Sequence, residues 1–413
     1  MPPKSSAAAG IPADLKLNNR IQVLNVFKCG REYTANEVAA QIGLSRQTAM
    51  KAIQFFVDKG LLTPAGKGAS TNVGGKKPAL FSLASDKYLL CIEIWPEELN
   101  FILLDFRGTV IDRFTLKQPL LEDAARTMET VGGMAVQLLA QNRIDKAALY
   151  GVSVSTPGII DYKAGVLKYN SLCPTWGADI PVVEMLRPYF GGNTRIVMEN
   201  VAKMTARSLL QDRDISKLRV LAIFSAWGLS GCLIDRGYIQ NGKDSLIGEF
   251  GHMILDASDP ERCGCGGHGC FERLVSNARV RADVEKRLEQ YPDSMFHCIS
   301  REEMKVETLF ELSGRGDALA RAVVKELAGV FAMALRNITL LYDPDLVVFQ
   351  GDYAHADETF RGELIRALGE FQYYPDGGPF ELSFDKRPIN DLDLQGAYVF
   401  LLDRLFSDTS LYE

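Results

Sequence analysis

Three cysteines lie close together in a glycine-rich stretch, Cys263-Gly-Cys-Gly-Gly-His-Gly-Cys270. Thiols at this spacing can converge on one metal ion, because glycines permit the backbone conformations that a tight loop needs. A fourth ligand would complete a tetrahedral zinc site, and the candidates are His252 and His268. Four protein ligands leave no open coordination position, so we expect a structural zinc ion. The alternatives are reduced surface cysteines or a redox pair.

The composition places the chain among globular proteins. It has 413 residues, 47% hydrophobic and 24% charged, which suggests two or three domains. No apolar run approaches the roughly 18 residues needed to cross a bilayer, which excludes a membrane-spanning protein. The first ten residues lack the apolar core of a secretory signal, and the eight cysteines do not resemble a secreted disulfide framework. We therefore expect a cytoplasmic protein.

The net charge of −6 hides a strong asymmetry along the chain. Residues 1–82 contain 11 Lys and Arg but only 4 Asp and Glu, whereas the remainder is acidic. A basic head on an acidic body indicates that the head alone meets a polyanion.

The head has the pattern of a helix-turn-helix. Helical spacing of apolar residues over 17–27 predicts a first helix. Thr34 and Glu37 have the spacing of a capping box, which opens a second short helix. Gly43 then suits a helix C-cap and Ser45 the N-cap of a third helix. Helix, glycine turn and capped helix together are typical of DNA-binding proteins.

The third helix has an apolar stripe for packing and an opposite face with amide and cationic groups but no acid. Glutamine and arginine can make bidentate contacts to base edges in the major groove. The residues that we expect to face bases or nearby phosphates are Ser45, Arg46, Gln47, Thr48 and Lys51. Residues 63–83 predict a two-stranded wing whose basic tip would place Lys76 and Lys77 on phosphate or in the minor groove. The alternative is a solvated helix and a basic loop.

Beyond residue 88, short strand hairpins alternate with helices, and this arrangement occurs twice. The first set ends at a buried strand over 147–154, and the second leads to a long helix over 317–341 and a strand over 345–350. We therefore expect an α/β body with two similar lobes.

The motifs of the body resemble a known family. Glu249-Phe-Gly-His252 followed by Cys263-x-Cys-Gly-x-x-Gly-Cys-x-Glu272 is similar to the signature of the ROK family (repressors, open reading frames, sugar kinases). Segments 151–161 and 342–351 resemble its sugar-lobe turn and its adenosine-side segment. The resemblance covers residues 88–405. It implies an actin-like, ribonuclease H-like body of two α/β lobes with a ligand cleft.

A winged helix-turn-helix ahead of such a body marks the repressor branch of the family. The resemblance and the composition together predict four segments. These are a disordered tail over 1–14, a winged helix-turn-helix domain over 15–83, a first lobe over 87–195 plus 390–408, and a second lobe with the zinc loop over 196–389.

The resemblance also implies roles for individual residues. His252, Cys263, Cys265 and Cys270 match the family's zinc ligands, which favours His252 over His268. Glu249, His252 and Glu272 match groups that hydrogen-bond sugar hydroxyls, and carboxylate and imidazole groups suit that task. The residues expected to bind an effector are Asn200, Glu249, His252 and Glu272. The alternative for the two glutamates is ordinary loop carboxylates.

Several positions depart from the kinase branch. Val201 stands where the kinases have the aspartate that removes the proton from the sugar hydroxyl, and an isopropyl group cannot accept a proton. Trp95 and Pro96 occupy the first phosphate turn, and Trp227 the second, where small residues normally let phosphate approach. The sequence therefore predicts a protein without kinase activity. Val201 and Lys203 also leave the effector open: a deoxy sugar, an acidic sugar paired with Lys203, a non-sugar ligand, or none.

The function expected from the sequence is a DNA-binding transcriptional regulator of carbohydrate metabolism or transport genes, with repression favoured. Its partners would be a double-stranded DNA operator and a sugar-like effector. Symmetric half-sites suit a homodimer or homotetramer. The alternatives are an effector-independent DNA-binding regulator and an active ATP-dependent sugar kinase.

Overall fold

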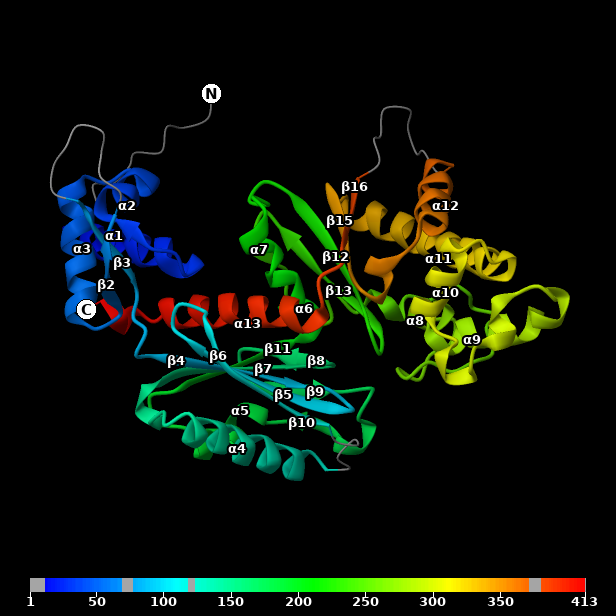
Figure 1. The fold of residues 1–413 in the computed structure, drawn as a ribbon, viewed down its shortest axis with the longest axis horizontal. Coiled ribbons are helices and arrows are strands. Elements are labelled where there is room, and N and C mark those ends of the chain that lie inside the picture. The colour runs from blue at the N-terminus through cyan, green and yellow to red at the C-terminus, as the bar shows by residue number, and fades with distance from the viewer. Residues whose placement is uncertain (1–11, 69–76, 118–122, 371–379, 413) are drawn as a thin grey trace. The chain divides into compact units, whose positions relative to one another are not determined.

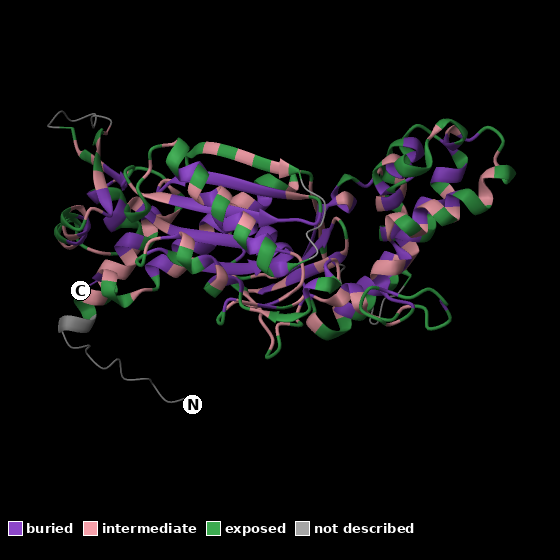
Figure 2. Cartoon of the chain, turned by 90° about the horizontal axis from the view of Figure 1, so that it is seen from below, coloured by how far each residue is buried: buried purple, intermediate pink, exposed green. Residues whose placement is uncertain are grey.

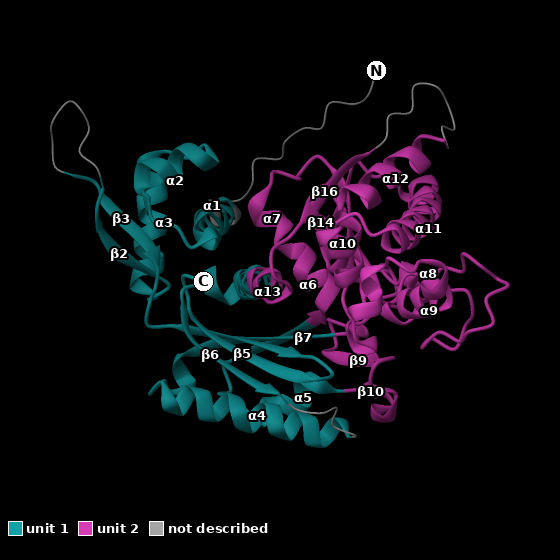
Figure 3. Cartoon of the chain, turned by 45° about the vertical axis from the view of Figure 1, so that its right-hand side comes forward, with its two compact units in different colours: residues 1–156, 181–198, 397–413 teal, residues 157–180, 199–396 magenta. Residues whose placement is uncertain are grey.

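The computed structural model describes residues 12–68, 77–117, 123–370 and 380–412, with the backbone alone at 12–14. The chain forms two compact units (Figures 1 and 3). Unit 1 contains residues 1–156, 181–198 and 397–413, and unit 2 contains residues 157–180 and 199–396. Within the part that the structure describes, no helix is both long and apolar enough to cross a membrane.

The head is a three-helix domain with a small sheet, which confirms the predicted winged helix-turn-helix. Its elements are α1 (Pro12–Val26), β1 (Tyr33–Thr34), α2 (Ala35–Ile42), α3 (Arg46–Asp58), β2 (Leu62–Lys67) and β3 (Ala79–Leu83), with strand order β1-β3-β2. The capping box of Thr34 and Glu37 forms as expected, and Gly43 ends α2 in the left-handed region. Because α1 begins at Pro12, residues 12–14 are helical and do not belong to the predicted tail. Residues 1–11 of that tail lie outside the described residues.

The rest of unit 1 is built on a five-stranded sheet in the order β11-β7-β4-β5-β6. The elements are β4 (Tyr88–Ile94), β5 (Glu98–Asp105), β6 (Val110–Lys117), α4 (Ala124–Gln141), β7 (Leu149–Thr156), α5 (Val182–Leu186) and β11 (Arg195–Asn200). Strands β4, β5 and β7 are buried along nearly their whole length because both sheet faces are covered (Figure 2). Helix α4 covers one face (Figure 1). The other meets α13 (Ile389–Phe406), whose Leu401 would lie 2.8 Å from a Cβ at Gly151.

Unit 2 repeats this plan with a second five-stranded sheet, in the order β14-β13-β12-β15-β16. Its strands are β12 (Arg219–Ser225), β13 (Leu229–Asp235), β14 (Tyr238–Ile239), β15 (Leu346–Gly351) and β16 (Glu381–Asp385). Each sheet combines antiparallel neighbours with parallel ones, as β12 does with β13 and β15. Two similar α/β lobes are therefore present, as predicted.

Alternate residues of these strands pack against different helices. Leu221, Ile223 and Phe349 belong to a core with α10 (Val306–Gly314), α11 (Ala318–Tyr342) and α12 (Glu358–Gly369). Val220, Ala222 and Val348 face the other way, toward α6 (Val201–Arg207) and α7 (Leu209–Asp212). The period of two along each strand thus buries both sheet faces. The remaining helices are α8 (Phe271–Leu274) and α9 (Asn277–Arg287).

The unit boundaries differ from the predicted lobes, most of all at residues 157–180 and at the head. Residues 157–180 belong to unit 2, because β8 (Ile159–Asp161), β9 (Val166–Tyr169) and β10 (Ala178–Ile180) form a separate three-stranded sheet. The head joins unit 1 instead of standing apart. The C-terminal residues explain this grouping, because the Tyr412 ring packs edge-on against Phe56 of α3 at 5.9 Å.

Candidate functional site

The predicted metal ligands converge. One donor atom from each of His252, Cys263, Cys265 and Cys270 lies within 4.8 Å of the other three. The Nδ1 atom of His252 lies 3.5 Å from the Cys263 sulfur, and the Cys265 and Cys270 sulfurs lie 3.6 Å apart. These separations match the edges of about 3.8 Å expected for a zinc–thiolate tetrahedron. The exposed His268 is not in the set and forms an isolated β-bridge with Arg262.

The loop that carries the thiols depends on glycine. Gly266 and Gly269 have φ values of 87° and 64°, a region that side chains rarely adopt. A Cβ at Gly269 would also lie 1.8 Å from the carbonyl oxygen of Asp256. The Cys263 amide donates to the Gly267 carbonyl and closes the turn.

The chemistry of this donor set favours a cation. Burial, followed by the neighbouring thiols, raises the pKa of Cys270 to about 12. Three adjacent thiolates would repel one another, so in the protein alone this thiol stays protonated. A zinc ion would remove that barrier, since it binds thiolates and imidazole and lowers the pKa of its ligands. The residues present therefore fit a tetrahedral zinc ion.

Glu249 lies beside the imidazole of the cluster. Its Oε2 is 3.9 Å from Nε2 of His252, while Nδ1 of the same ring faces the thiols. Gly248 and Gly251, on either side, press against β13: a Cβ at either position would lie within 2.2 Å of a backbone oxygen of that strand. Burial raises the pKa of the Glu249 carboxyl, and the charges of His252 and Lys203 act against this rise. A carboxylate that orients a metal-binding histidine is a common arrangement.

Glu272 joins the cluster to β13. Its Oε2 accepts the Leu229 amide hydrogen at 2.7 Å, and its Oε1 lies 3.8 Å from the Cys263 sulfur. A Cβ at Gly228 would lie 2.7 Å from Oε2, so glycine is needed for this approach. Glu272 also acts electrostatically on Glu249 and raises its pKa. The structure thus brings Glu249, His252 and Glu272 together, with one oxygen of Glu272 already used by the protein.

Asn200 caps helix α6. Its Oδ1 accepts the Ala202 amide hydrogen at 2.8 Å, and its Nδ2 donates to the Gly158 carbonyl at 2.7 Å. The amide therefore fixes the start of α6 and the turn before β8. Val201 follows it and is 3% exposed, so an apolar side chain fills the position that the sequence marked as the kinase proton acceptor.

A buried cation was not among the predicted site residues. Lys203 is 4% exposed, and its ammonium group donates to Oδ1 of Asn241 at 3.0 Å. Its charge lowers the pKa of Glu249, which places it near the predicted effector groups. On the same helix, Arg207 pairs with the fully buried Glu199 at 3.5 Å. The sequence showed a lysine at position 203, where the family has asparagine, but no motif indicated that this lysine pairs with Asn241.

The predicted DNA-facing residues lie together at the start of α3. The Ser45 hydroxyl accepts the Thr48 amide hydrogen at 3.1 Å and so caps the helix. Arg46, Gln47 and Lys51 are exposed, while Ala49, Ala52, Ile53 and Phe56 are buried. In the wing, Lys77 is exposed and Lys76 lies outside the described residues. The helix thus presents amide and cationic groups on its free face.

Each of the two predicted phosphate turns contains a tryptophan. Trp95 lies in the β4–β5 turn and is 6% exposed, and its amide donates to the Glu98 carbonyl. Trp227 lies in the β12–β13 turn and is 46% exposed. Neither turn is therefore a run of small residues of the kind that lets phosphate approach backbone amides.

Comparison with known proteins identifies the body. The sequence profile described as the ROK family matches residues 89–373. The chain belongs to the ROK family. The xylose repressor of Caldicellulosiruptor bescii is 20% identical over 86% of this chain and 88% of its own. The glucokinase of Thermotoga maritima is 23% identical over 62% of this chain and 80% of its own. The repressor match thus spans more of this ROK protein than the kinase match does.

Solved structures show the same fold. A crystal structure described as a ROK family transcriptional regulator, homologous to the Escherichia coli MLC protein, matches with a TM-score of 0.75. It is 17% identical and covers 96% of this chain and 98% of its own. The ROK fold therefore extends over nearly the whole chain, including the head.

The metal cluster gives the first prediction. Cys265→Ser should lower the zinc content of the purified ROK protein from about one ion per chain toward zero and lower its unfolding midpoint by several degrees, because one of four ligands is lost. Zinc would be measured by inductively coupled plasma mass spectrometry. Cys298→Ser, at an exposed cysteine outside the cluster, is the matched control and should leave both quantities unchanged. Full zinc content in Cys265→Ser would contradict the assignment.

Proposed function

We propose that this ROK protein is a DNA-binding transcriptional repressor controlled by a sugar-like effector, and that it has no kinase activity. The observation that carries the proposal is the combination of a basic winged helix-turn-helix with a ROK body whose proton-acceptor position is Val201. The xylose repressor of Caldicellulosiruptor bescii and the N-acetylglucosamine repressor of Escherichia coli O6:H1 both match this chain, the latter at 22% identity over 78% of it. The repressor function of these two relatives supports repression as the outcome of DNA binding.

The DNA contacts would come from α3 and the wing. Arg46, Gln47 and Lys51 project from the first two turns of a helix whose opposite face is buried. That geometry lets the helix enter the major groove with its N-terminal residues at the base edges. Lys77 would contact a phosphate, and Lys76, which the structure does not describe, would act with it. One head gives limited specificity, so the working assembly would be a homodimer or homotetramer on a symmetric operator.

The effector would bind in unit 2. Glu249 and Glu272 accept hydrogen bonds and His252 can donate one, so the three suit vicinal hydroxyl groups. The zinc ion would be structural: with three cysteines and His252 as ligands, it has no open position for chemistry. Asn200 would contribute mainly by holding α6 and the Gly158 turn in place. Such a regulator would act in the cytoplasm, beside its operator.

Kinase chemistry lacks two requirements. Val201 is 3% exposed and apolar, so no carboxylate stands at the family position to take the hydroxyl proton. Trp95 and Trp227 occupy the phosphate turns. Phosphoryl transfer depends on positioning and neutralising phosphate, and these turns would provide neither.

The recognition helix gives the second prediction. The double variant Gln47→Ala plus Lys51→Ala should bind the operator at least about tenfold more weakly, because one base-edge contact and one cationic contact are lost. Fluorescence anisotropy at fixed salt would measure the affinity. The operator itself would come from genomic binding-site mapping.

A matched control removes the same two groups from the body. Lys286→Ala plus Gln290→Ala, both exposed in unit 2, should leave operator affinity unchanged. Equal affinity of the α3 double variant and the wild type would remove these side chains from the readout.

The third prediction concerns catalysis. In a coupled assay with ATP, magnesium and a panel of hexoses and pentoses, the wild type should show no turnover above the buffer rate. The physical reason is the absence of a general base at Val201. Turnover that Glu249→Ala abolishes would establish the kinase alternative, since contaminating kinases would not respond to that change.

A further inference from the structure

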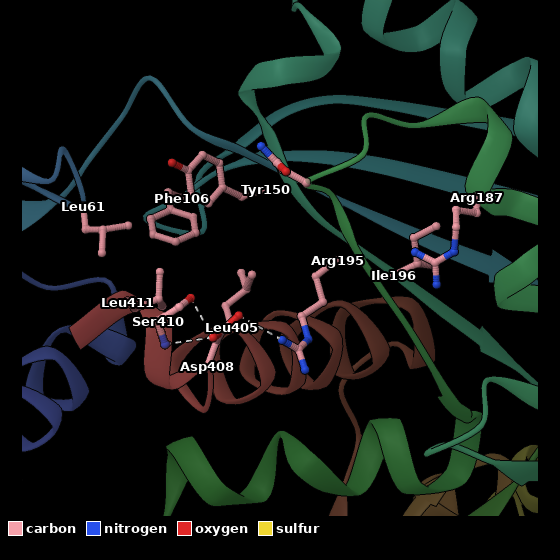
Figure 4. A pocket seen from close by; sticks show the side chains of 11 residues that line it. Leu61, Phe106, Tyr150, Arg187, Arg195, Ile196, Leu405, Asp408, Ser410 and Leu411 are labelled. Atoms are coloured by element: carbon pink, nitrogen blue, oxygen red, sulfur yellow. Dashed lines mark hydrogen bonds and ion pairs between the residues drawn. The ribbon is translucent and has the colours of Figure 1, made fainter. Parts of the chain in front are cut away.

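Unit 1 contains a cavity of about 670 Å³, within the range of small-molecule sites. Its walls come from the end of β5, the starts of β7 and β11, and the C-terminal residues after α13 (Figure 4). All of its lining residues belong to unit 1, whereas the proposed effector groups lie in unit 2. The cavity is therefore separate from the effector site.

Much of the lining is apolar and aromatic. Phe106 and Tyr150 meet edge to face with ring centroids 5.6 Å apart, and Figure 4 shows them across the cavity from Leu405 and Leu411. Ile196 adds a further apolar group from β11. A ligand with an aromatic or aliphatic body would bury apolar surface against these side chains.

Of the two arginines that line the cavity, Arg195 is held by the weaker interaction. Arg187 is held by two hydrogen bonds to Glu184, at 3.0 and 3.2 Å. Arg195 makes a long contact of 3.5 Å to Oδ2 of Asp408, and both side chains of this pair are more than 40% exposed. Figure 4 shows Arg195 pointing from its strand toward Asp408. A guanidinium group offers five donors and binds carboxylates in a bidentate manner, so it can exchange this contact for a better one.

Asp408, the other member of this pair, lies in the short C-terminal segment that packs against the recognition helix. Asp408 accepts two hydrogen bonds from Ser410, through the backbone amide and the hydroxyl. The Ser410 carbonyl accepts from Lys59, which follows α3. Tyr412, 2% exposed, packs its ring on Phe56 of α3, and its carbonyl accepts from Arg20 of α1. Asp408, Ser410 and Leu411 thus line the cavity, and the same short segment, through Ser410 and Tyr412, forms part of the packing of the head.

We infer that this cavity is a second ligand site, for small organic carboxylates with an apolar body, and that its occupancy lowers operator affinity. The ligand carboxylate takes Arg195 away from Asp408, and its body fills the space beside Phe106 and Leu411. Loss of the Arg195 contact loosens residues 408–412 and with them the support of Phe56. The site would therefore report a second metabolite class to the same recognition helix.

The test uses 3-phenylpropionate as the probe in isothermal titration with the full-length protein. We expect saturable binding of one molecule per chain with a dissociation constant of about 1 mM or tighter. Acetate lacks the apolar body and 3-phenylpropan-1-ol lacks the charge, so neither should bind at the same concentrations. Equal binding of the acid and the alcohol would overturn the proposal, as would the absence of saturable binding of the acid.

Two variants give opposite signatures. Arg195→Gln should weaken binding of 3-phenylpropionate at least tenfold, and Asp408→Asn should tighten it severalfold, because the competing carboxylate is gone. Arg126→Gln, an exposed arginine on α4, is the matched control and should change nothing. Unchanged affinity in both cavity variants, with wild-type unfolding midpoints, would overturn the assignment of Arg195.

The operator readout rests on the proposed function, whereas the titration does not. Saturating 3-phenylpropionate should weaken operator binding by the wild type at least threefold and leave that of Arg195→Gln unaffected. Binding of the probe without any effect on operator affinity would overturn the link to the recognition helix and leave the repressor proposal intact. If the wild type without ligand does not bind the operator at all, the result would instead count against the proposed function.

Discussion

The convergence of four donor atoms within 4.8 Å is the constraint on which the proposed effector site depends. Three thiols and an imidazole this close need a cation to hold them as ligands. The positions of these ligands also fix the positions of two glutamates. His252 faces Glu249, and Cys270 immediately precedes α8, which carries Glu272. The proposed zinc ion would thus position two carboxylates that it does not bind.

A second constraint concerns the positions in α6 at which the kinase branch of the family has its catalytic residues. Helix α6 keeps the capping asparagine, but its first turn carries a buried valine, Val201, and a buried lysine, Lys203. The sheet depends on backbone hydrogen bonds and packing, and the cap on the Asn200 side chain, so neither needs a carboxylate at position 201. The proposed loss of kinase activity would follow because no carboxylate stands at position 201 to accept the hydroxyl proton. A fold can therefore be kept while its reaction is lost, and the site must be judged residue by residue.

Much of the fold could be predicted because the determining signals are local. The capping box of Thr34 and Glu37 and the C-cap at Gly43 each depend on residues only a few positions apart. The same is true of the short apolar runs that form the buried strands. The family resemblance then supplied His252 as the fourth ligand, which spacing alone left open against His268. The boundary at residues 157–180 could not be predicted, because it depends on a separate sheet formed by three short strands. Phe55, on the outer side of α3, is explained only by tertiary contact: the Arg20 guanidinium lies 3.4 Å from its ring centroid.

The central proposal is that the unit 2 site controls DNA binding. The most direct measurement is operator affinity in the presence of each member of a sugar panel, for the wild type and for Glu249→Gln. We expect at least one sugar to change wild-type operator affinity by about 5- to 150-fold, the usual range of allosteric coupling, and the isosteric variant to lose this response. Wild-type operator affinity that no sugar changes, or an equal response in Glu249→Gln, would contradict this proposal.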